Sequence, residues 1–241
     1  MRGWWREISG LVLPAFCNGC GVPRTQLCVE CADALHGAAA RRARPVPEPA
    51  GLPVVHAAAV YADSVRAVLL AHKERGAMGL AGPLGAALAG AVRAAVADVP
   101  GSDGPLLLVP VPSARNVVRA RGHDAARRIA RAAAGDLRRT GRAAGVLPVL
   151  RQRRWVADQA GLTGRQRLEN LSGALEVRPG GRRLLADGRA VIVDDVMTTG
   201  ASLAEAARAL SAAADLDSAW FDQPIAAVVA VSPLSFELNR N

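Results

Sequence analysis

From residue 54 onward, short apolar runs alternate with alanine-rich stretches in which apolar residues recur at helical spacing. The apolar runs have the length of strands, and the alanine-rich stretches are long enough for helices. The run over 190–195 is apolar without alternation until two acids end it, which is typical of a strand buried on both faces of a parallel sheet. The predicted strands are 54–61, 106–109, 146–150, 174–177, 190–195 and 225–231, and the predicted helices are 64–73, 80–99, 123–139 and 202–214.

This alternation predicts an α/β domain, in which a parallel sheet is flanked by helices on both faces. Three parts are expected along the 241 residues. Residues 1–40 hold all four cysteines, residues 41–53 contain four prolines and are expected to be a linker, and residues 54–241 form the α/β domain. Ligands of such sheets bind at the carboxyl ends of the strands, so the motifs that end a strand are the candidates for a site.

The chain is strongly basic, with a formal net charge of +9. Lys73 is the only lysine, and we attribute part of the arginine excess to a general preference for arginine rather than to function. Fourteen arginines between Arg115 and Arg167 are accompanied by only three acids. This span indicates either a positive surface for a phosphorylated ligand or nucleic acid, or the solvated faces of ordinary helices.

No segment is expected to span a membrane or to act as a cleaved leader. The longest apolar window, Gly79 to Val92, ends at Arg93 and is shorter than the roughly 18 residues that a span requires. Near the N-terminus, Arg6 and Glu7 interrupt the apolar stretch that a signal peptide needs. We therefore expect a cytoplasmic protein.

All four cysteines lie in one window, in the order C-x2-C, seven residues, C-x2-C. Each C-x2-C turn directs two sulfur atoms to one point, and two such turns complete a tetrahedral zinc site. The alternatives are a redox pair and structural disulfides, which a cytosolic setting disfavours. Four protein ligands leave no position open for water, so a structural zinc knuckle is expected. Its ligands are Cys17, Cys20, Cys28 and Cys31.

The stretch VIVDDVMTTGAS, residues 191–202, places two adjacent acids at the end of a predicted strand and a hydroxyl-rich turn before a predicted helix. Asp194 and Asp195 suit a vicinal diol, because each carboxylate accepts a hydrogen bond from one ribose hydroxyl. The turn gathers backbone N–H groups and the positive end of the helix dipole around an anion. A diol beside a phosphate describes a ribose phosphate. The residues expected to bind it are Val196, Met197, Thr198, Thr199, Gly200, Ala201 and Ser202.

Two other interpretations of this stretch are weaker. A plain N-capped helix would not need the paired acids. A Walker-type nucleotide site would need G-x4-G-K-[ST], and the sequence AHKERG around the only lysine does not supply it.

The stretch resembles the phosphoribosyl diphosphate signature of type I phosphoribosyltransferases: a hydrophobic run, two acids, a hydrophobic residue, any residue, two small hydroxyl residues and glycine. The order of the other motifs resembles the ComF family, named for DNA uptake in competent bacteria. Those motifs are the cysteine window, LLAHKERG, VPVP followed by RARGHDAARRIA, DQAGLTGRQRLENLSGA, and then the signature. The resemblance extends from Cys17 to about Val231.

This resemblance implies a type I phosphoribosyltransferase-like fold that binds phosphoribosyl diphosphate with Mg²⁺, with Asp194 and Asp195 as the catalytic acids. It also implies that residues 109–113 take the diphosphate and that residues 151–170 form a mobile loop that closes over it. The implied partners are phosphoribosyl diphosphate or a nucleotide, and single-stranded DNA or the competence helicase machinery. The residues that match the two loops are Val111, Pro112, Ser113, Gln159, Arg165 and Asn170.

Arginines in residues 151–170 also suit a diphosphate on chemical grounds, because guanidinium groups bind phosphate oxygens in pairs. A charged surface loop is the alternative. The arginines concerned are Arg151, Arg153, Arg154 and Arg165.

The chain departs from the family pattern at residues 123–125, where Phe-Asn-Gln is usual and this chain has His123, Asp124 and Ala125. His123 is either a proton carrier or a structural residue at a helix start. Two other functions stay open: a nucleobase salvage phosphoribosyltransferase, and a non-catalytic protein that senses a nucleotide or handles single-stranded DNA. Some purine-salvage relatives carry a carboxylate at the position of Thr198, and its absence counts against that kind of enzyme.

Overall fold

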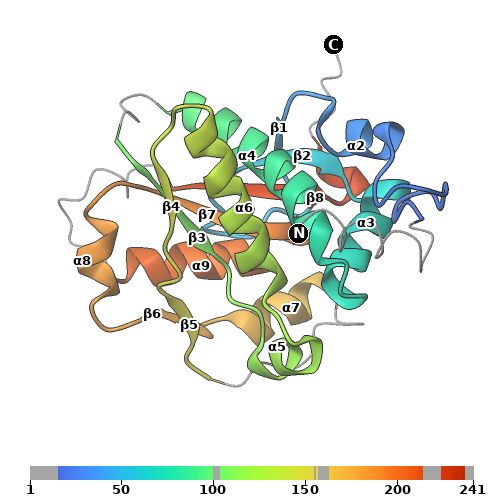
Figure 1. Cartoon of the computed structure of the whole chain (residues 1–241). Helices are drawn as coiled ribbons and strands as arrows, with labels where there is room; N and C mark the ends of the chain where they lie inside the picture. Colours follow the sequence, from blue (N-terminus) through green and yellow to red (C-terminus); the bar gives the residue numbers. More distant parts are fainter. Residues whose placement is uncertain (1–15, 100–103, 155, 157–162, 214–223, 237–241) are drawn as a thin grey trace, which may run out of the picture.

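The computed structural model of the chain describes residues 16–99, 104–154, 156, 163–213 and 224–236. Its centre is a six-stranded sheet in the order β1-β2-β8-β7-β3-β4 (Figure 1). Every neighbouring pair is parallel except β1 and β2, so the predicted α/β architecture is confirmed, with one antiparallel strand at the edge. The strands are β1 Arg41–Ala43, β2 Val54–Val60, β3 Leu106–Pro110, β4 Ala144–Val146, β7 Arg189–Met197 and β8 Ile225–Val231.

Helices cover both faces of this sheet, as predicted (Figure 1). Helices α4 (Ala81–Ala97) and α6 (Ala125–Arg139) pack on one face, and α9 (Ala201–Ser211) packs on the other. In the central strand β7, Val191 belongs to the core under α4 and α6, whereas its neighbour Ile192 belongs to the core under α9. Successive strand residues point to opposite faces, so the uninterrupted apolar run of β7 is buried on both sides.

Among the described residues, one helical segment is long and apolar enough to cross a membrane by length and composition. It comprises the 3₁₀ turn η1 (Met78–Leu80) and α4, and it continues past the exposed Arg93, as the helix predicted over 80–99 does. The expectation that its apolar stretch is too short to span a membrane is therefore wrong by length and composition. α4 packs on α6, β2 and β8. A Cβ atom on Gly85 would lie 2.4 Å from the Cβ of Ala132 in α6. α4 is therefore packed as a core helix of the α/β domain.

Two predicted strands lie elsewhere than expected. Residues 146–150 divide between the end of β4 and the start of β5 (Leu150–Gln152), because Pro148 has no N–H to donate to a sheet. Residues 174–177 form β6 (Leu175–Val177), which pairs antiparallel with β5 in a separate two-stranded sheet beside α9. The apolar pattern marks both segments as extended, but it carries no information on the partner strand.

Residues 41–53 are not a linker throughout. The first three form β1, which pairs with β2, and the Arg44 N–H donates to the Ser235 carbonyl oxygen at 2.6 Å. Pro45, Pro49 and Leu52 lie against the signature turn, close to Gly200. Proline favours extended backbone, and the same composition serves a free linker and an extended segment held by packing.

Helix α2 (Val29–His36) attaches the cysteine segment to the α/β domain. It contacts α3 (Asp63–Glu74), α4 and β2, and Leu35 is fully buried in the core that α4 shares. Short helices that the sequence pattern did not predict lie in arginine-rich or loop-like stretches. They are α5 Arg115–Arg121, α7 Gly164–Leu171, α8 Gly181–Leu185 and the 3₁₀ turn η3 Pro233–Ser235.

Candidate functional site

The carboxyl ends of β3, β7 and β8 bring two predicted motifs together. The Val111 N–H, just after β3, donates to the Val193 carbonyl oxygen at 3.0 Å, and the Ser232 N–H, just after β8, donates to the Met197 carbonyl oxygen at 3.1 Å. The loop predicted to take a diphosphate therefore begins directly beside the acids of the signature. This edge of the sheet is where ligands of open α/β folds bind.

The two acids lie within β7, because that strand continues to Met197 instead of ending at Asp195 as predicted. Neighbouring strand residues point to opposite faces, so the two carboxylates occupy different surroundings. Asp195 is 5% exposed, and its Oδ2 lies 2.7 Å from Lys73 Nζ at the end of α3. Asp194 is more exposed, and its Oδ1 accepts a hydrogen bond from the Asp195 N–H at 2.8 Å.

Burial and the charges of the neighbouring side chains determine the pKa values of Asp194 and Lys73. Loss of hydration, and then the charge of Asp195, raise the pKa of Asp194 well above its usual range, while the charge of Lys73 opposes that rise. Burial lowers the pKa of Lys73, but the charges of Asp195 and Asp194 outweigh it and the net pKa is raised. Lys73 is therefore a protonated cation beside two acids, and its charge favours the ionised form of both.

Lys73 was not among the predicted site residues. It reaches Asp195 across a large separation in sequence, so no local pattern places the two together. One signal was available: the chain has a single lysine among 30 basic residues. An ammonium group is a compact point charge, whereas a guanidinium is a planar fork, so a lone lysine in an arginine-rich chain marks a position to examine.

Three consecutive residues at the end of α3 each contact a different element. His72 packs edge-on against the His123 ring, with ring centroids 5.7 Å apart, while Lys73 pairs with Asp195. Glu74 accepts a hydrogen bond from Arg121 Nε in α5 at 2.8 Å. The sequence AHKERG therefore joins α3 to both β7 and the segment that follows the predicted diphosphate loop.

Two of the three residues at the departure from the family pattern, His123 and Asp124, have structural partners. His123 Nε2 lies 3.1 Å from the His72 carbonyl oxygen, and its Nδ1 lies 3.1 Å from the Arg121 carbonyl oxygen. Asp124 is the N-cap of α6, where its Oδ1 accepts from the Arg127 N–H at 3.1 Å. The structural interpretation of His123 accounts for these contacts.

Of the predicted mobile loop, helix α7 reaches the signature turn. Arg167 Nη1 donates to Thr198 Oγ1 at 3.1 Å. Arg165, the arginine predicted from the resemblance, has a side chain that is 89% exposed and pairs with Glu169 at 2.9 Å. Residues two apart on a helix do not face the same way, which is why one arginine meets the turn and the other does not. Gln159 lies outside the described residues.

Other arginines of the same segment hold it in place. Arg154 Nη2 donates to the carbonyl oxygens of Asn170 and Ser172 at 2.9 and 2.7 Å, and Arg151 Nε donates to Glu176 at 2.8 Å. For Arg151 and Arg154, these contacts fit the alternative of a charged surface segment better than binding of a diphosphate.

The segment after α7 is also fixed to α9 by a buried acid that the sequence analysis missed. Glu205 is 5% exposed and accepts hydrogen bonds from the N–H groups of Gly173 at 3.1 Å and Leu175 at 2.8 Å. Arg208 Nε donates to it at 2.7 Å. In sequence, Glu205 and Arg208 look like an ordinary surface ion pair on a helix.

Gly200 is the N-cap of α9 and has a φ of 76°, in the left-handed region that favours glycine. A Cβ atom there would also lie 2.8 Å from Leu52 Cδ1 and 3.1 Å from Pro49 Cγ. Glycine is therefore needed at this position for two reasons. It adopts the left-handed backbone conformation of the turn without strain, and it leaves room for the proline-rich segment that lies against the turn. The first N–H groups of α9 have no intrahelical acceptor, and a glycine N-cap offers no side chain to them.

Replacing Gly200 with alanine is expected to lower the free energy of unfolding by about 1–3 kcal/mol, because left-handed backbone in a residue with a Cβ is strained. The urea midpoint measures this. Gly90→Ala is the matched control, since a Cβ there meets nothing within 4 Å and alanine is the better helix former. Equal midpoints for Gly200→Ala and wild type would contradict the assignment.

The four cysteines form the cluster that the spacing predicts. Their Sγ atoms all lie within 4.8 Å of one another, with Cys17 and Cys20 at 3.6 and 3.5 Å from Cys28, and all four thiols are free. A tetrahedral site with Zn–S bonds of about 2.3 Å has S···S edges of about 3.8 Å. The cluster is therefore compatible with a structural zinc ion.

Two local features prepare this cluster. Burial raises the pKa of Cys17, but hydrogen bonds from the backbone N–H groups of Cys20, Cys28 and Gly19 outweigh it and lower the pKa to about 6, which favours the thiolate that binds metal. A Cβ on Gly19 would lie 2.5 Å from Cys31 Sγ and 3.2 Å from Ser64 Cβ. Glycine at this position lets the turn lie close to the opposite sulfur and to the start of α3.

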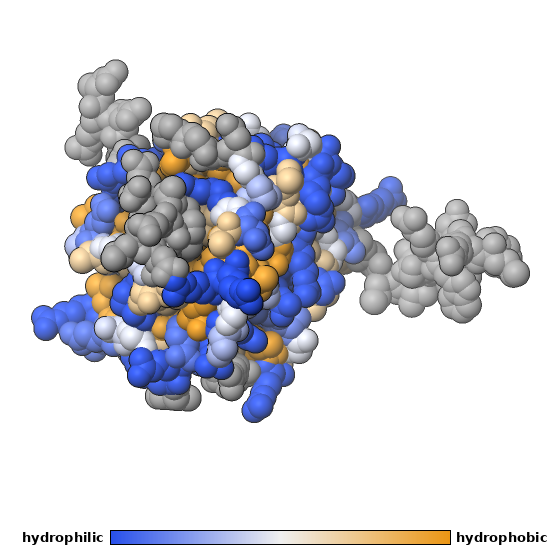
Figure 2. Space-filling model, turned by 90° about the vertical axis from the view of Figure 1, so that its left-hand side faces the viewer, coloured by the Kyte–Doolittle hydropathy of each residue, from blue (hydrophilic) through white to orange (hydrophobic). Residues whose placement is uncertain are grey.

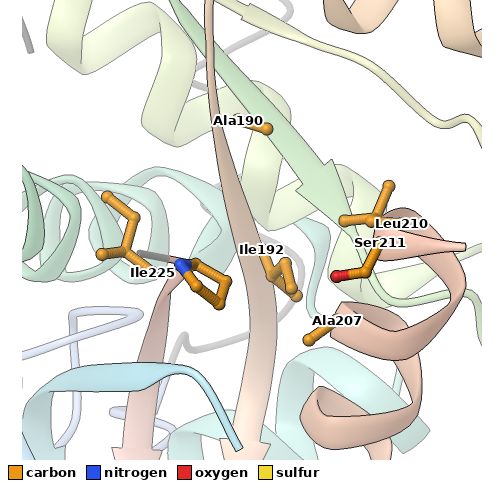
Figure 3. Close-up of a pocket in the computed structure, with 7 residues that line it drawn as sticks. Ala190, Ile192, Ala207, Leu210, Ser211 and Ile225 are labelled. Carbon is orange, nitrogen blue, oxygen red and sulfur yellow. The ribbon is translucent and has the colours of Figure 1, made fainter. Parts of the chain in front are cut away.

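An apolar pocket lies at the other end of the sheet, between the amino ends of β7 and β8 and the end of α9. Ile192, Ala207 and Leu210 gather there (Figure 3). Figure 2 views the molecule from the side of α8, which precedes β7, and shows hydrophobic residues between hydrophilic ones. Among the described residues that line this pocket, Ser211 is the only one with a polar side chain, so those residues do not supply the groups that a charged ligand needs.

A scan of the chain against protein-family models found no matching family, and a search of curated proteins found no match.

Proposed function

We propose that this protein is a ComF-like, type I phosphoribosyltransferase-like protein that binds phosphoribosyl diphosphate at the carboxyl ends of β3 and β7. One observation carries the proposal: a buried central strand bears an acid pair, runs into a Thr-Thr-Gly turn at the start of α9, and lies beside the loop after β3. The acid pair offers carboxylates to a diol, and the turn offers backbone N–H groups to a phosphate. The loop after β3, which would take the diphosphate, lies next to both.

The parts of the ligand divide among these elements. The acid pair would accept hydrogen bonds from the ribose hydroxyls, and the turn from Thr198 to Ser202 would surround the 5-phosphate with N–H and hydroxyl donors at the start of a helix. The diphosphate would lie against residues 111–113. Arg167, which donates to Thr198, would supply a guanidinium beside the turn.

Mg²⁺ fits this site as a partner of the ligand's own oxygens. When bound, it would neutralise the negative charge of the diphosphate leaving group. The acid pair provides oxygen acceptors for the waters that Mg²⁺ keeps.

The chemistry supported by such a site is displacement of diphosphate from C1 of the ribose by a nucleophile, commonly a ring nitrogen of a base. The C1–O bond to the leaving group breaks, positive charge develops on the ribose, and the new bond forms at C1. Rate enhancement would come from positioning and charge stabilisation rather than from a covalent intermediate. Thr198 holds a hydroxyl where a purine-salvage enzyme would hold a proton-donating carboxylate, which favours a different acceptor.

Calorimetric titration with phosphoribosyl diphosphate and Mg²⁺ tests the proposal. Wild type is expected to bind, and Asp194→Ala/Asp195→Ala is expected to bind about 10- to 100-fold more weakly, because the acid pair can no longer make a hydrogen bond to the ribose, and such a bond to a charged group is worth about 1.5–3 kcal/mol. Asp33→Ala/Asp187→Ala is the control, since it removes the same charge at two exposed positions. Absence of binding by wild type would remove the proposed function.

A further inference from the structure

Resting on the proposed function, we propose that Lys73 is a positioning residue of the ribose site. It holds Asp195 in a fixed ion pair, so that Asp194 is the carboxylate that meets the ligand. The two acids, equivalent in the sequence, thereby take different roles.

The two neighbouring carboxylates have different surroundings. Asp195 has a side chain that is 7% exposed, and its Oδ2 lies 2.7 Å from Lys73 Nζ. Asp194 is more exposed and receives the Asp195 N–H on its Oδ1, which fixes the orientation of its carboxylate. A buried carboxylate already paired with a cation is poorly placed to receive a sugar hydroxyl, whereas an oriented and partly exposed one is well placed.

Lys73 is itself held from several directions. The residues on either side of it, His72 and Glu74, contact His123 and Arg121. The start of the same helix lies against the zinc knuckle, where Ser64 is the neighbour of Gly19. Helix α3 is therefore fixed at both ends, and its ammonium group reaches Asp195 from a rigid base rather than from a loop.

Lys73 also affects the ionisation of Asp194 through its charge. Two adjacent carboxylates in a partly buried place repel each other, and burial with the charge of Asp195 raises the pKa of Asp194. The Lys73 charge opposes that rise, so it favours the ionised form of Asp194 that accepts a hydroxyl proton in a hydrogen bond.

A set of variants tests this inference by titration with phosphoribosyl diphosphate and Mg²⁺. Asp194→Asn is expected to weaken binding more than Asp195→Asn. Lys73→Gln is expected to weaken it about tenfold, the loss of one charge-assisted interaction, and Lys73→Arg to recover most of that loss because the positive charge stays near Asp195. Arg66→Gln, an exposed residue on the same helix, is the charge-matched control.

The double variant Lys73→Gln/Asp195→Asn gives the decisive comparison. If Lys73 acts through Asp195, the double variant binds within about twofold of Asp195→Asn, because the effect of a positioning residue disappears with its partner. A full additional loss in the double variant would show that Lys73 contacts the ligand itself and would overturn the inference. Equal losses for Asp194→Asn and Asp195→Asn would overturn it as well.

Failure of the proposed function is a separate result. Wild type that does not bind the ligand removes the proposed function, and this inference with it. Wild type that binds, with Lys73→Gln binding as wild type does, overturns the inference alone. Thermal unfolding of the same variants without ligand checks that each is folded at the titration temperature.

Discussion

Replacing Cys31 with serine is expected to abolish stoichiometric zinc binding and to lower the thermal unfolding midpoint of the whole domain. Cys31 lies on α2, is 3% exposed, and shares that helix with the fully buried Leu35. Folding and zinc binding are coupled in such knuckles, so loss of the metal loosens α2 from α3 and α4. If this costs about 2 kcal/mol, the midpoint falls by roughly 4–8 °C for a chain of this size.

Metal analysis and calorimetry measure both parts of this prediction. Protein purified without added metal should contain about one zinc ion per chain. Asp33→Ser, an exposed position on the same helix, should retain the metal and the midpoint. Wild type that lacks metal and has four fully reactive thiols would reject the knuckle.

Replacing Glu205 with glutamine is expected to lower the free energy of unfolding by about 2–3 kcal/mol at neutral pH, since hydrogen bonds to a buried charged group are lost or weakened. Burial raises the pKa of Glu205, but the hydrogen bonds from Arg208 and from the Leu175 and Gly173 N–H groups outweigh it, and the net pKa is lowered from 4.5. A lowered folded-state pKa contributes stability that is present above pH 4.5 and is lost as the pH falls through the folded-state value.

The pH dependence therefore distinguishes charge from packing. The stability difference between wild type and Glu205→Gln should be constant near neutral pH and should shrink below about pH 4.5. Glu169→Gln is the control, because its ion pair with Arg165 is exposed and contributes little. A difference that stays constant down to acid pH would show that the Glu205 charge contributes nothing.

The prediction from sequence succeeded where the information is local. The signature is contiguous: an apolar run before Asp194 is followed by the turn at Gly200 and then by a helix. The four cysteines also lie in one short window, and their spacing alone predicts that the sulfur atoms come together. Each of these was found at the predicted place along the chain. Such local features depend on the backbone preference of each residue and on the spacing of apolar residues along the chain, and both can be taken from a single sequence.

The prediction failed where residues far apart in sequence meet. Nothing near Lys73 indicates Asp195 as its partner, and the pattern around Glu205 is that of an exposed helical ion pair even though the acid is buried. Arg165 was preferred to Arg167 because the resemblance indicated it, whereas the orientation of α7 brings Arg167 to Thr198. Which side chains meet in these three cases depends on tertiary packing, because packing determines which side of a helix contacts its neighbour.

The short antiparallel strand β1 has a consequence for solubility. Strand β2, Val54–Val60, is almost entirely buried and apolar, and as an outer strand it would offer a row of open N–H and C=O groups to other chains. β1 occupies that position and places the exposed side chains of Arg41 and Arg42 along the border instead. Part of the arginine excess of this protein thus serves to keep one molecule from adding its sheet to the next.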